Sequence, residues 1–159
     1  MTENSCEIRG GDFRRAGAAS RLLKEQLERI GVAPEVLRRA MIAAYEAEMN
    51  VVVHARRGVM KTVLDGTQAR VEVLDEGPGI ADPGLAMTEG CSTAGREARQ
   101  LGFGAGLGLP NIRKSADRFT IESTVGQGTR LRFTIYLKAP GGRPRQAEGA
   151  QIFSICPST

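Results

Sequence analysis

The sequence lacks most of the features that mark secreted, membrane-spanning or zinc-binding proteins. Aromatic residues make up only 4% of the 159 residues. The sequence contains no run of 18 apolar residues, which is about the length needed to span a membrane. Three scattered cysteines (Cys6, Cys91 and Cys156) argue against a disulfide framework, and no CxxC pair or histidine cluster suggests zinc. The N-terminus shows no secretory signal pattern, so we expect a protein of the reducing cytoplasm.

Charge gives a second exclusion. The 22 basic and 18 acidic residues leave a formal net charge of +4, but the few aromatics and the absence of a basic helix with base-stacking residues disfavour nucleic-acid binding. The same positive excess suits a nucleotide phosphate or an acidic protein partner.

The periodicity of apolar residues predicts an α+β protein, a two-layer sandwich of a mixed, mostly antiparallel sheet with helices on one face. We expect a domain over 1–138 and a flexible tail over 139–159, with Arg56, Arg57 and Gly58 in the last turn of the second helix. The predicted helices are 14–31, 33–58, 83–89 and 107–116, and the predicted strands are 5–9, 59–64, 68–75, 119–123 and 129–137.

The second predicted helix carries a polar stripe on an otherwise apolar surface. Glu46, Asn50 and His54 are spaced i, i+4, i+8 and fall on one side of a helical wheel. One interpretation is a solvated helix edge. The other is a site in which Asn50 offers an oxygen to Mg²⁺, Glu46 accepts a proton from a hydroxyl, and His54 is a structural hydrogen-bonding residue.

A carboxylate is predicted at the inner face of the second hairpin strand. Val71, Val73 and Asp75 share one face by two-residue alternation, and Gly77-Pro78-Gly79 follows. An inward Asp75 at a glycine-lined opening would accept a hydrogen bond from an amino group such as that of adenine. The alternative is an aspartate that only forms a turn before Gly-Pro-Gly.

A threonine on the last predicted strand has the matching orientation. Thr129 shares its parity with Leu131 and Phe133, so its hydroxyl also faces inward, directly after Gly126-Gln127-Gly128. It would complete a pocket for a base. The alternative is an ordinary threonine at a strand edge.

Four glycines alternate over 102–108, directly before the third long helix. Exposed backbone N–H groups at such glycines, together with a helix N-terminus, favour a phosphate. The segment is neither a GxxxxGK[ST] loop nor a dinucleotide fingerprint, because no Lys-Ser/Thr follows Gly108 and no strand immediately precedes it.

In order and spacing, these pieces resemble the ATP-binding boxes of the GHKL superfamily, over about residues 35–137. The matching pieces are Glu46-x-x-x-Asn50-x-x-x-His54, Asp75-Glu76-Gly77-Pro78-Gly79, the run GFGAGLGL (102–109), and Gly126-Gln127-Gly128-Thr129. His54 is the only histidine and already lies in a box, so we expect no phospho-accepting histidine, and we expect no transducer domain after the boxes. It therefore resembles the small anti-sigma-factor serine/threonine kinases, whose lid region is similar to residues 82–93.

The resemblance implies the histidine-kinase-like ATPase fold, with ATP and Mg²⁺ as cofactors, a regulatory protein partner and a homodimer. Glu46 would be the general base, Asn50 the metal ligand, and Asp75 with Thr129 the adenine pocket, while Arg96 and Arg99 are lid cations that could assist transfer. The remaining implied nucleotide contacts are His54, Gly77, Gly79, Ile80, Thr93, Gly102, Gly104, Ala105, Gly106, Leu107 and Gly108. The alternative function is a module that senses ATP and ADP and regulates a partner without phosphotransfer.

The stretch before Asn50 departs from the family pattern. Typical members have threonine or alanine directly before the asparagine, whereas this chain has Glu48-Met49-Asn50, in which Glu48 adds a carboxylate nearby. It points about 200° away from Glu46 on the helical wheel. We expect Glu48 to affect a partner surface.

Overall fold

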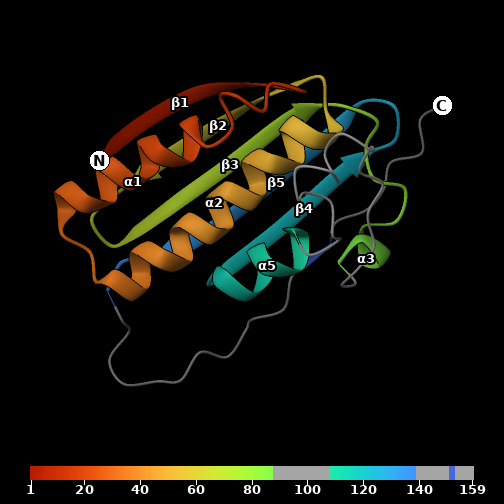
Figure 1. Cartoon of the computed structure of the whole chain (residues 1–159). Helices are drawn as coiled ribbons and strands as arrows, with labels where there is room; N and C mark the ends of the chain where they lie inside the picture. The colour runs from red at the N-terminus through yellow and green to blue at the C-terminus, as the bar shows by residue number, and fades with distance from the viewer. Residues whose placement is uncertain (88–107, 139–150, 153–159) are drawn as a thin grey trace.

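The structure is a computed structural model, and it describes residues 1–87, 108–138 and 151–152. Figure 1 shows one sheet with helices lying across one of its faces. The elements are β1 (Thr2–Arg9), α1 (Ala18–Ile30), α2 (Pro34–His54), β2 (Arg57–Leu64), β3 (Gln68–Glu76), α3 (Pro83–Ala86), α5 (Gly108–Ser115), β4 (Arg118–Thr124), β5 (Gly128–Tyr136) and β6 (Gln151–Ile152).

The sheet has the strand order β1-β2-β3-β5-β4-β6, and every neighbouring pair is antiparallel except the parallel pair of β4 and β6. The prediction of a mixed, mostly antiparallel sheet with helices on one face is therefore confirmed. Gln151 and Ile152 pair with Thr120 and Ile121, although both lie in the segment predicted to be a flexible tail. The rest of 139–159 lies outside the described residues, so the domain boundary stays a prediction.

Helix α2 lies at the centre of the helical layer, between α1 and α5 (Figure 1), and packs against both. Its buried side forms one core with the inward positions of the strands, since residues two apart on a strand share a face. The most completely buried large side chains that the strands contribute to that core are Met60, Val71, Ile121, Phe133 and Ile135. No helix in the described part of the chain combines the length and apolarity needed to cross a membrane.

The junction between α2 and β2 differs from the prediction. The helix ends at His54, Ala55 is extended (φ −103°, ψ 167°), and β2 already begins at Arg57. Gly58 lies opposite Asp75 in the sheet, and a Cβ there would approach Val51 Cγ1 to 2.9 Å. The assignment of residues 56–58 to the last helical turn was wrong because this glycine serves close helix-on-sheet packing rather than a helix end.

Glu48 is also placed differently from our expectation. Its side chain is buried, with only 1% of the residue exposed, and it accepts hydrogen bonds from the backbone N–H groups of Gly17, Ala19 and Ser20 and from the Ser20 hydroxyl, at 2.6–3.2 Å. Gly17, the N-cap of α1, has no side chain to do this. Glu48 caps the first turn of α1 from the neighbouring helix, so the expected role at a partner surface was wrong.

Candidate active site

The sheet presents a half-buried carboxylate where β3 ends. Val71 and Val73 are almost fully buried, and Asp75 occupies the next position on the same face, as the alternation predicts. Asp75 Oδ1 accepts a hydrogen bond from the backbone N–H of Thr129 at 3.1 Å. Burial raises the pKa of Asp75 to about 6, and the Thr129 hydrogen bond opposes that rise. The carboxylate is thus held in place and has a second oxygen, Oδ2, for a ligand.

Glycines flank this carboxylate on two sides. A Cβ on Gly77 would lie 3.2 Å from Asp75 Oδ1, and one on Gly128 would collide with the backbone oxygen of Asp75. Gly128 also has φ +149°, and Gly79 has φ +71° where its missing Cβ would strike Thr124 O. Any side chain at Gly77 or Gly128 would crowd the space beside Asp75, so the glycines that the sequence singled out here leave the carboxylate accessible.

A hydroxyl network beside Asp75 includes a residue that the sequence analysis missed. Ser123 Oγ accepts a hydrogen bond from the backbone N–H of Ile80 at 2.7 Å and lies 2.9 Å from Thr129 Oγ1. It is also 3.2 Å from the carbonyl oxygen of Gly128, to which it can donate. Ser123 therefore ties the loop after β3 to the end of β5. Its parity with Phe119 and Ile121 was the signal that it faces inward.

The second part of the site is the polar stripe of α2. Glu46, Asn50 and His54 are all half-buried, so each keeps part of its surface for solvent or a ligand. A Cβ on Gly108 would lie 3.1 Å from Glu46 Oε2 and 3.5 Å from Asn50 Oδ1. The first residue of α5 thus meets the stripe across the boundary between the two helices.

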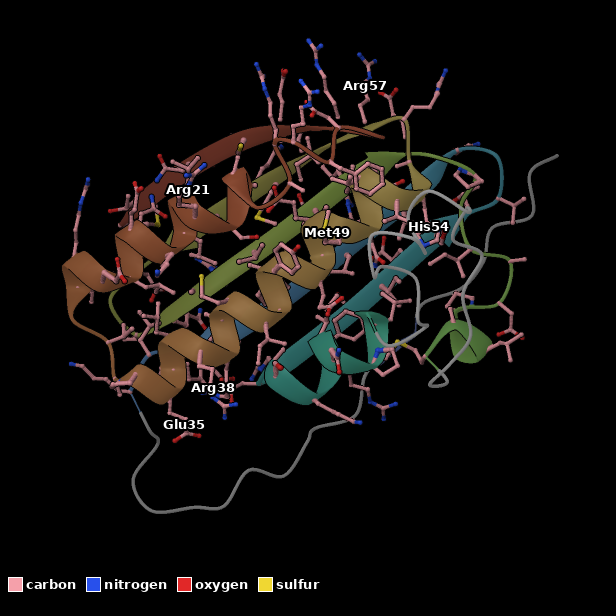
Figure 2. The ribbon with its side chains drawn as sticks, viewed as in Figure 1. Arg21, Glu35, Arg38, Met49, His54 and Arg57 are labelled. Atoms are coloured by element: carbon pink, nitrogen blue, oxygen red, sulfur yellow. The ribbon has the colours of Figure 1, made fainter. Side chains whose placement is uncertain are left out.

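His54 closes the stripe at the last turn of α2. Figure 2 shows it there, while Arg57, three residues later, lies at the rim of the molecule. Burial lowers the pKa of His54 below its ordinary value, so the imidazole is neutral at neutral pH. A neutral ring suits the structural hydrogen-bonding role predicted for it better than a role in binding an anion by charge.

Helix α5 is anchored at its far end. Arg39 Nη1 donates to the carbonyl oxygen of Ser115 at 3.1 Å and pairs with Asp117 Oδ2 at 3.2 Å, with the two side chains only 9% and 10% exposed. Asp117 Oδ2 also accepts from the backbone N–H of Tyr136 at 2.7 Å. The contacts fix the C-terminal end of α5 relative to α2 and β5, and so fix where its first turn meets Glu46.

A family model described as the histidine kinase-like ATPase domain matches residues 12–135. The chain belongs to this family. The match includes β3, the α2 stripe, α5 and the Ser123–Thr129 pair, so both parts of the site lie within the domain. Membership of this family makes ATP its nucleotide.

Individual relatives narrow the comparison. The chain is 28% identical over 125 residues to the serine/threonine-protein kinase RsbT of Bacillus subtilis (strain 168), covering 76% of this chain and 88% of RsbT. It is 33% identical over 100 residues to an anti-sigma F factor of Thermoanaerobacter sp. (strain X514), covering 60% of this chain and 66% of that protein. It is 32% identical over 103 residues to the anti-sigma F factor of Caldanaerobacter subterraneus subsp. tengcongensis, covering 65% of this chain and 64% of that protein. The chain spans slightly under two thirds of these anti-sigma F factors.

The remaining predicted contacts of this ATPase domain lie outside the described residues: Thr93, Gly102, Gly104, Ala105, Gly106 and Leu107, with the lid cations Arg96 and Arg99. The structure brings the other predicted residues to two places. Asp75, Gly77, Gly79, Ile80 and Thr129 gather at the ends of β3 and β5, and Glu46 and Asn50 meet Gly108 between α2 and α5.

Proposed function

We propose that this chain is an ATP- and Mg²⁺-dependent serine/threonine protein kinase that phosphorylates a small regulatory partner protein. The observation that carries the proposal is Glu46, a half-buried carboxylate next to the first residue of α5 and one turn from Asn50. A domain that only sensed nucleotide would need the pocket at Asp75 but would not need a proton acceptor at the other end of the nucleotide.

The base end of ATP would be held by the β3 and β5 residues. Asp75 Oδ2 accepts the exocyclic amine of adenine, with the Thr129 hydroxyl beside it, and Gly77 and Gly79 allow the ring to approach the backbone. The phosphates would lie toward the N-terminal end of α5, where the helix dipole and the N–H groups of the first turn favour anions. The same positioning accounts for most of the rate of phosphoryl transfer.

Magnesium fits this site through Asn50. Within the part of the chain that the structure describes, no three His, Cys, Asp or Glu side chains come together as a protein-only metal site. Mg²⁺ commonly keeps several waters and takes its other ligands from substrate phosphates, so one amide oxygen from the protein is an adequate contribution. When bound, the ion would neutralise charge on the phosphates.

In the transfer itself, the hydroxyl oxygen of a serine or threonine on the partner attacks the γ-phosphorus. The bond from that phosphorus to the β–γ bridging oxygen breaks, and ADP leaves with the bridging oxygen. The hydroxyl proton passes to the Glu46 carboxylate, which lies next to the phosphate end of the site. RsbT is by name a serine/threonine-protein kinase and the other relatives are by name anti-sigma factors, which supports a regulatory protein as substrate.

The test is incubation of the purified protein with labelled ATP, magnesium and its cognate partner, identified by pull-down in ATP and in ADP. We expect phosphate on a serine or threonine of the partner, and Glu46→Gln should lower the transfer rate by about 10²- to 10⁴-fold, the range for loss of a general base. ATP affinity should stay within about twofold of the wild type, because the mutation removes an interaction made in the transition state.

The control is Glu25→Gln, the same chemical change at an exposed position of α1, which should leave transfer unchanged. Equal transfer by the Glu46→Gln protein would overturn the proposal. A partner complex that differs between ATP and ADP, without any phosphoprotein, would support the nucleotide-sensing module instead. We also infer a homodimer acting in the cytoplasm, which sedimentation and fractionation would check.

A further inference from the structure

Asn111 was in none of the motifs, yet its side chain contacts the proposed base. It stands on α5, three residues after Gly108, and its Nδ2 donates a hydrogen bond to Glu46 Oε1 at 3.3 Å. Among the described residues, Asn111 is the hydrogen-bond partner of this carboxylate. Both side chains are half-buried, so water competes only in part for the contact.

The contact makes the two oxygens of Glu46 different. Oε1 faces the Asn111 amide, whereas Oε2 faces the first turn of α5, 3.1 Å from where a Cβ on Gly108 would stand. The carboxylate is otherwise free to rotate about its last bond, because that torsion is broad in glutamate. A donor on one oxygen selects the orientation that turns the other toward the phosphate end of the site.

We propose that Asn111 is a positioning residue that orients Glu46 for proton transfer. The inference rests on the proposed function, and it adds to it a residue that acts through the base without touching ATP or the partner. Reaction rates depend steeply on such placement, since an error of about 1 Å can cost about a hundredfold.

The same contact links the base to the helix that carries the phosphate-binding turn. Gly108 and Asn111 are on one short helix, whose C-terminal end is fixed by Arg39 through Ser115 and Asp117. The orientation of Glu46 therefore depends on the position of α5. When α5 is displaced from α2, the donor leaves Oε1 and the base loses its fixed orientation.

The experiment is steady-state phosphotransfer with Asn111→Ala and Asn111→Gln, measured with separate kcat and KM, alongside ATP affinity by calorimetry. Asn111→Ala should lower kcat about tenfold and leave ATP affinity within about twofold. Asn111→Gln keeps an amide donor and should recover part of kcat. The matched control is Arg113→Ala, an exposed position on the same helix, which should not change kcat.

A double mutant distinguishes a role of Asn111 in orienting Glu46 from a role in packing alone. Glu46→Asp withdraws the carboxylate by one methylene, out of reach of Asn111, and leaves a weak base. Adding Asn111→Ala to it should cause no further loss if Asn111 acts only through Glu46. A further tenfold loss there, an unchanged kcat in Asn111→Ala, or a kcat and an ATP affinity that fall together, would each overturn the inference.

Failure of this inference is distinguishable from failure of the proposed function. If Glu46→Gln still transfers phosphate, the assignment of the base is wrong whatever Asn111 does. If Glu46→Gln is inactive and Asn111→Ala behaves as the wild type, the kinase proposal stands and only the positioning role is lost. Should Asn111→Ala fail to fold, Asn111→Ser, which keeps a shorter donor, replaces it in the same scheme.

Discussion

The two ends of the candidate site are built differently. At the Asp75 end, three strand ends and a loop are joined by hydrogen bonds of 2.7–3.2 Å through Ser123 and Thr129. At the Glu46 end, the hydrogen bond described at the proposed general base is one 3.3 Å contact from Asn111, and another hydrogen bond between the two helices, from Arg39 to Ser115, lies at the far end of α5. A sheet end tied by several hydrogen bonds suits tight recognition of planar adenine, and a single hydrogen bond at the proposed general base suits a group that must reorganise around a reacting phosphate. Affinity and chemistry should therefore respond to different mutations.

The largest effect is expected from a residue that serves neither end. Glu48→Ala leaves three backbone N–H groups, two of them buried, and the Ser20 hydroxyl without their acceptor, and should lower the free energy of unfolding by about 3 kcal/mol or more. Denaturant unfolding would measure this. Transfer per folded molecule should stay near the wild-type rate. A selective loss of kcat in a stably folded variant would break the separation between Glu48 and the Glu46 end.

The next largest effect is expected from losing the recognition of adenine by Asp75. Asp75→Asn puts an amide where the carboxylate accepts the adenine amine, and ATP affinity by calorimetry should fall about 10- to 100-fold, the value of a hydrogen bond to a charged group. Without nucleotide, the melting temperature at pH 8 should instead rise by about 2–4 °C. The rise follows from the raised pKa, since burying the ionised form is unfavourable. Unchanged affinity would remove Asp75 from the pocket.

The glycine against Asp75 tests the rigidity of the same end. Gly128→Ala places a methyl against the backbone oxygen of Asp75 at φ +149°, and should cost about 1–3 kcal/mol of stability together with ATP affinity. Gly126→Ala is the matched control, because Gly126 also has positive φ but has open space around it. A Gly126→Ala loss as large as that of Gly128→Ala would show that backbone strain alone, and not crowding of Asp75, is responsible.

Loss of the Ser123 hydroxyl, which the sequence analysis missed, should have a smaller effect. Ser123→Ala removes the acceptor of the Ile80 N–H and the partner of Thr129 Oγ1, and about 1 kcal/mol of stability and up to about fivefold in ATP affinity should be lost. Ser123→Thr keeps the hydroxyl and should recover part of both. An effect on kcat at saturating ATP would contradict the division between the two ends.

The smallest expected effect is that of pH. With a pKa of about 6, the ionised fraction of Asp75 falls about fourfold between pH 7 and pH 5.5, and ATP affinity should fall by up to that factor. The sign for stability is opposite: since the folded pKa lies above the ordinary value, protonation of Asp75 favours the nucleotide-free fold as the pH falls from about 6 toward 4. Both trends should be absent in Asp75→Asn.

The Asp75 end of the site, where adenine is proposed to bind, was the easier part to predict from the sequence. Two-residue alternation placed Asp75 and Thr129 on the inner face, and the glycines beside them marked close backbone approach. Local periodicity is enough there, because strands that pair bring their inward positions together. The roles of Asp75 and Thr129 in binding nucleotide remain predictions.

The missed residues depend on partners far away in the chain. Glu48 caps a helix 28–31 residues before it, and Asn111 contacts a carboxylate 65 residues before it. A helical wheel shows which side a residue occupies but not what stands opposite, so Glu48 was an unexplained acid until α1 was placed. The assignment of Gly58 to a helix end failed for the same reason. A glycine after a helical pattern is equally typical of a helix end and of a close contact with another element.

The contact between the end of α2 and the end of β3 limits how the candidate site can change shape. A Cβ on Gly77 would lie 3.0 Å from Ala55 Cα, and one on Gly58 would press on Val51, so helix and strand touch here with almost no intervening side chain. This close packing fixes the distance between Asp75 and the last turn of α2, which ends at His54. A ligand of the wrong length therefore cannot be accommodated by moving the end of α2 away from β3.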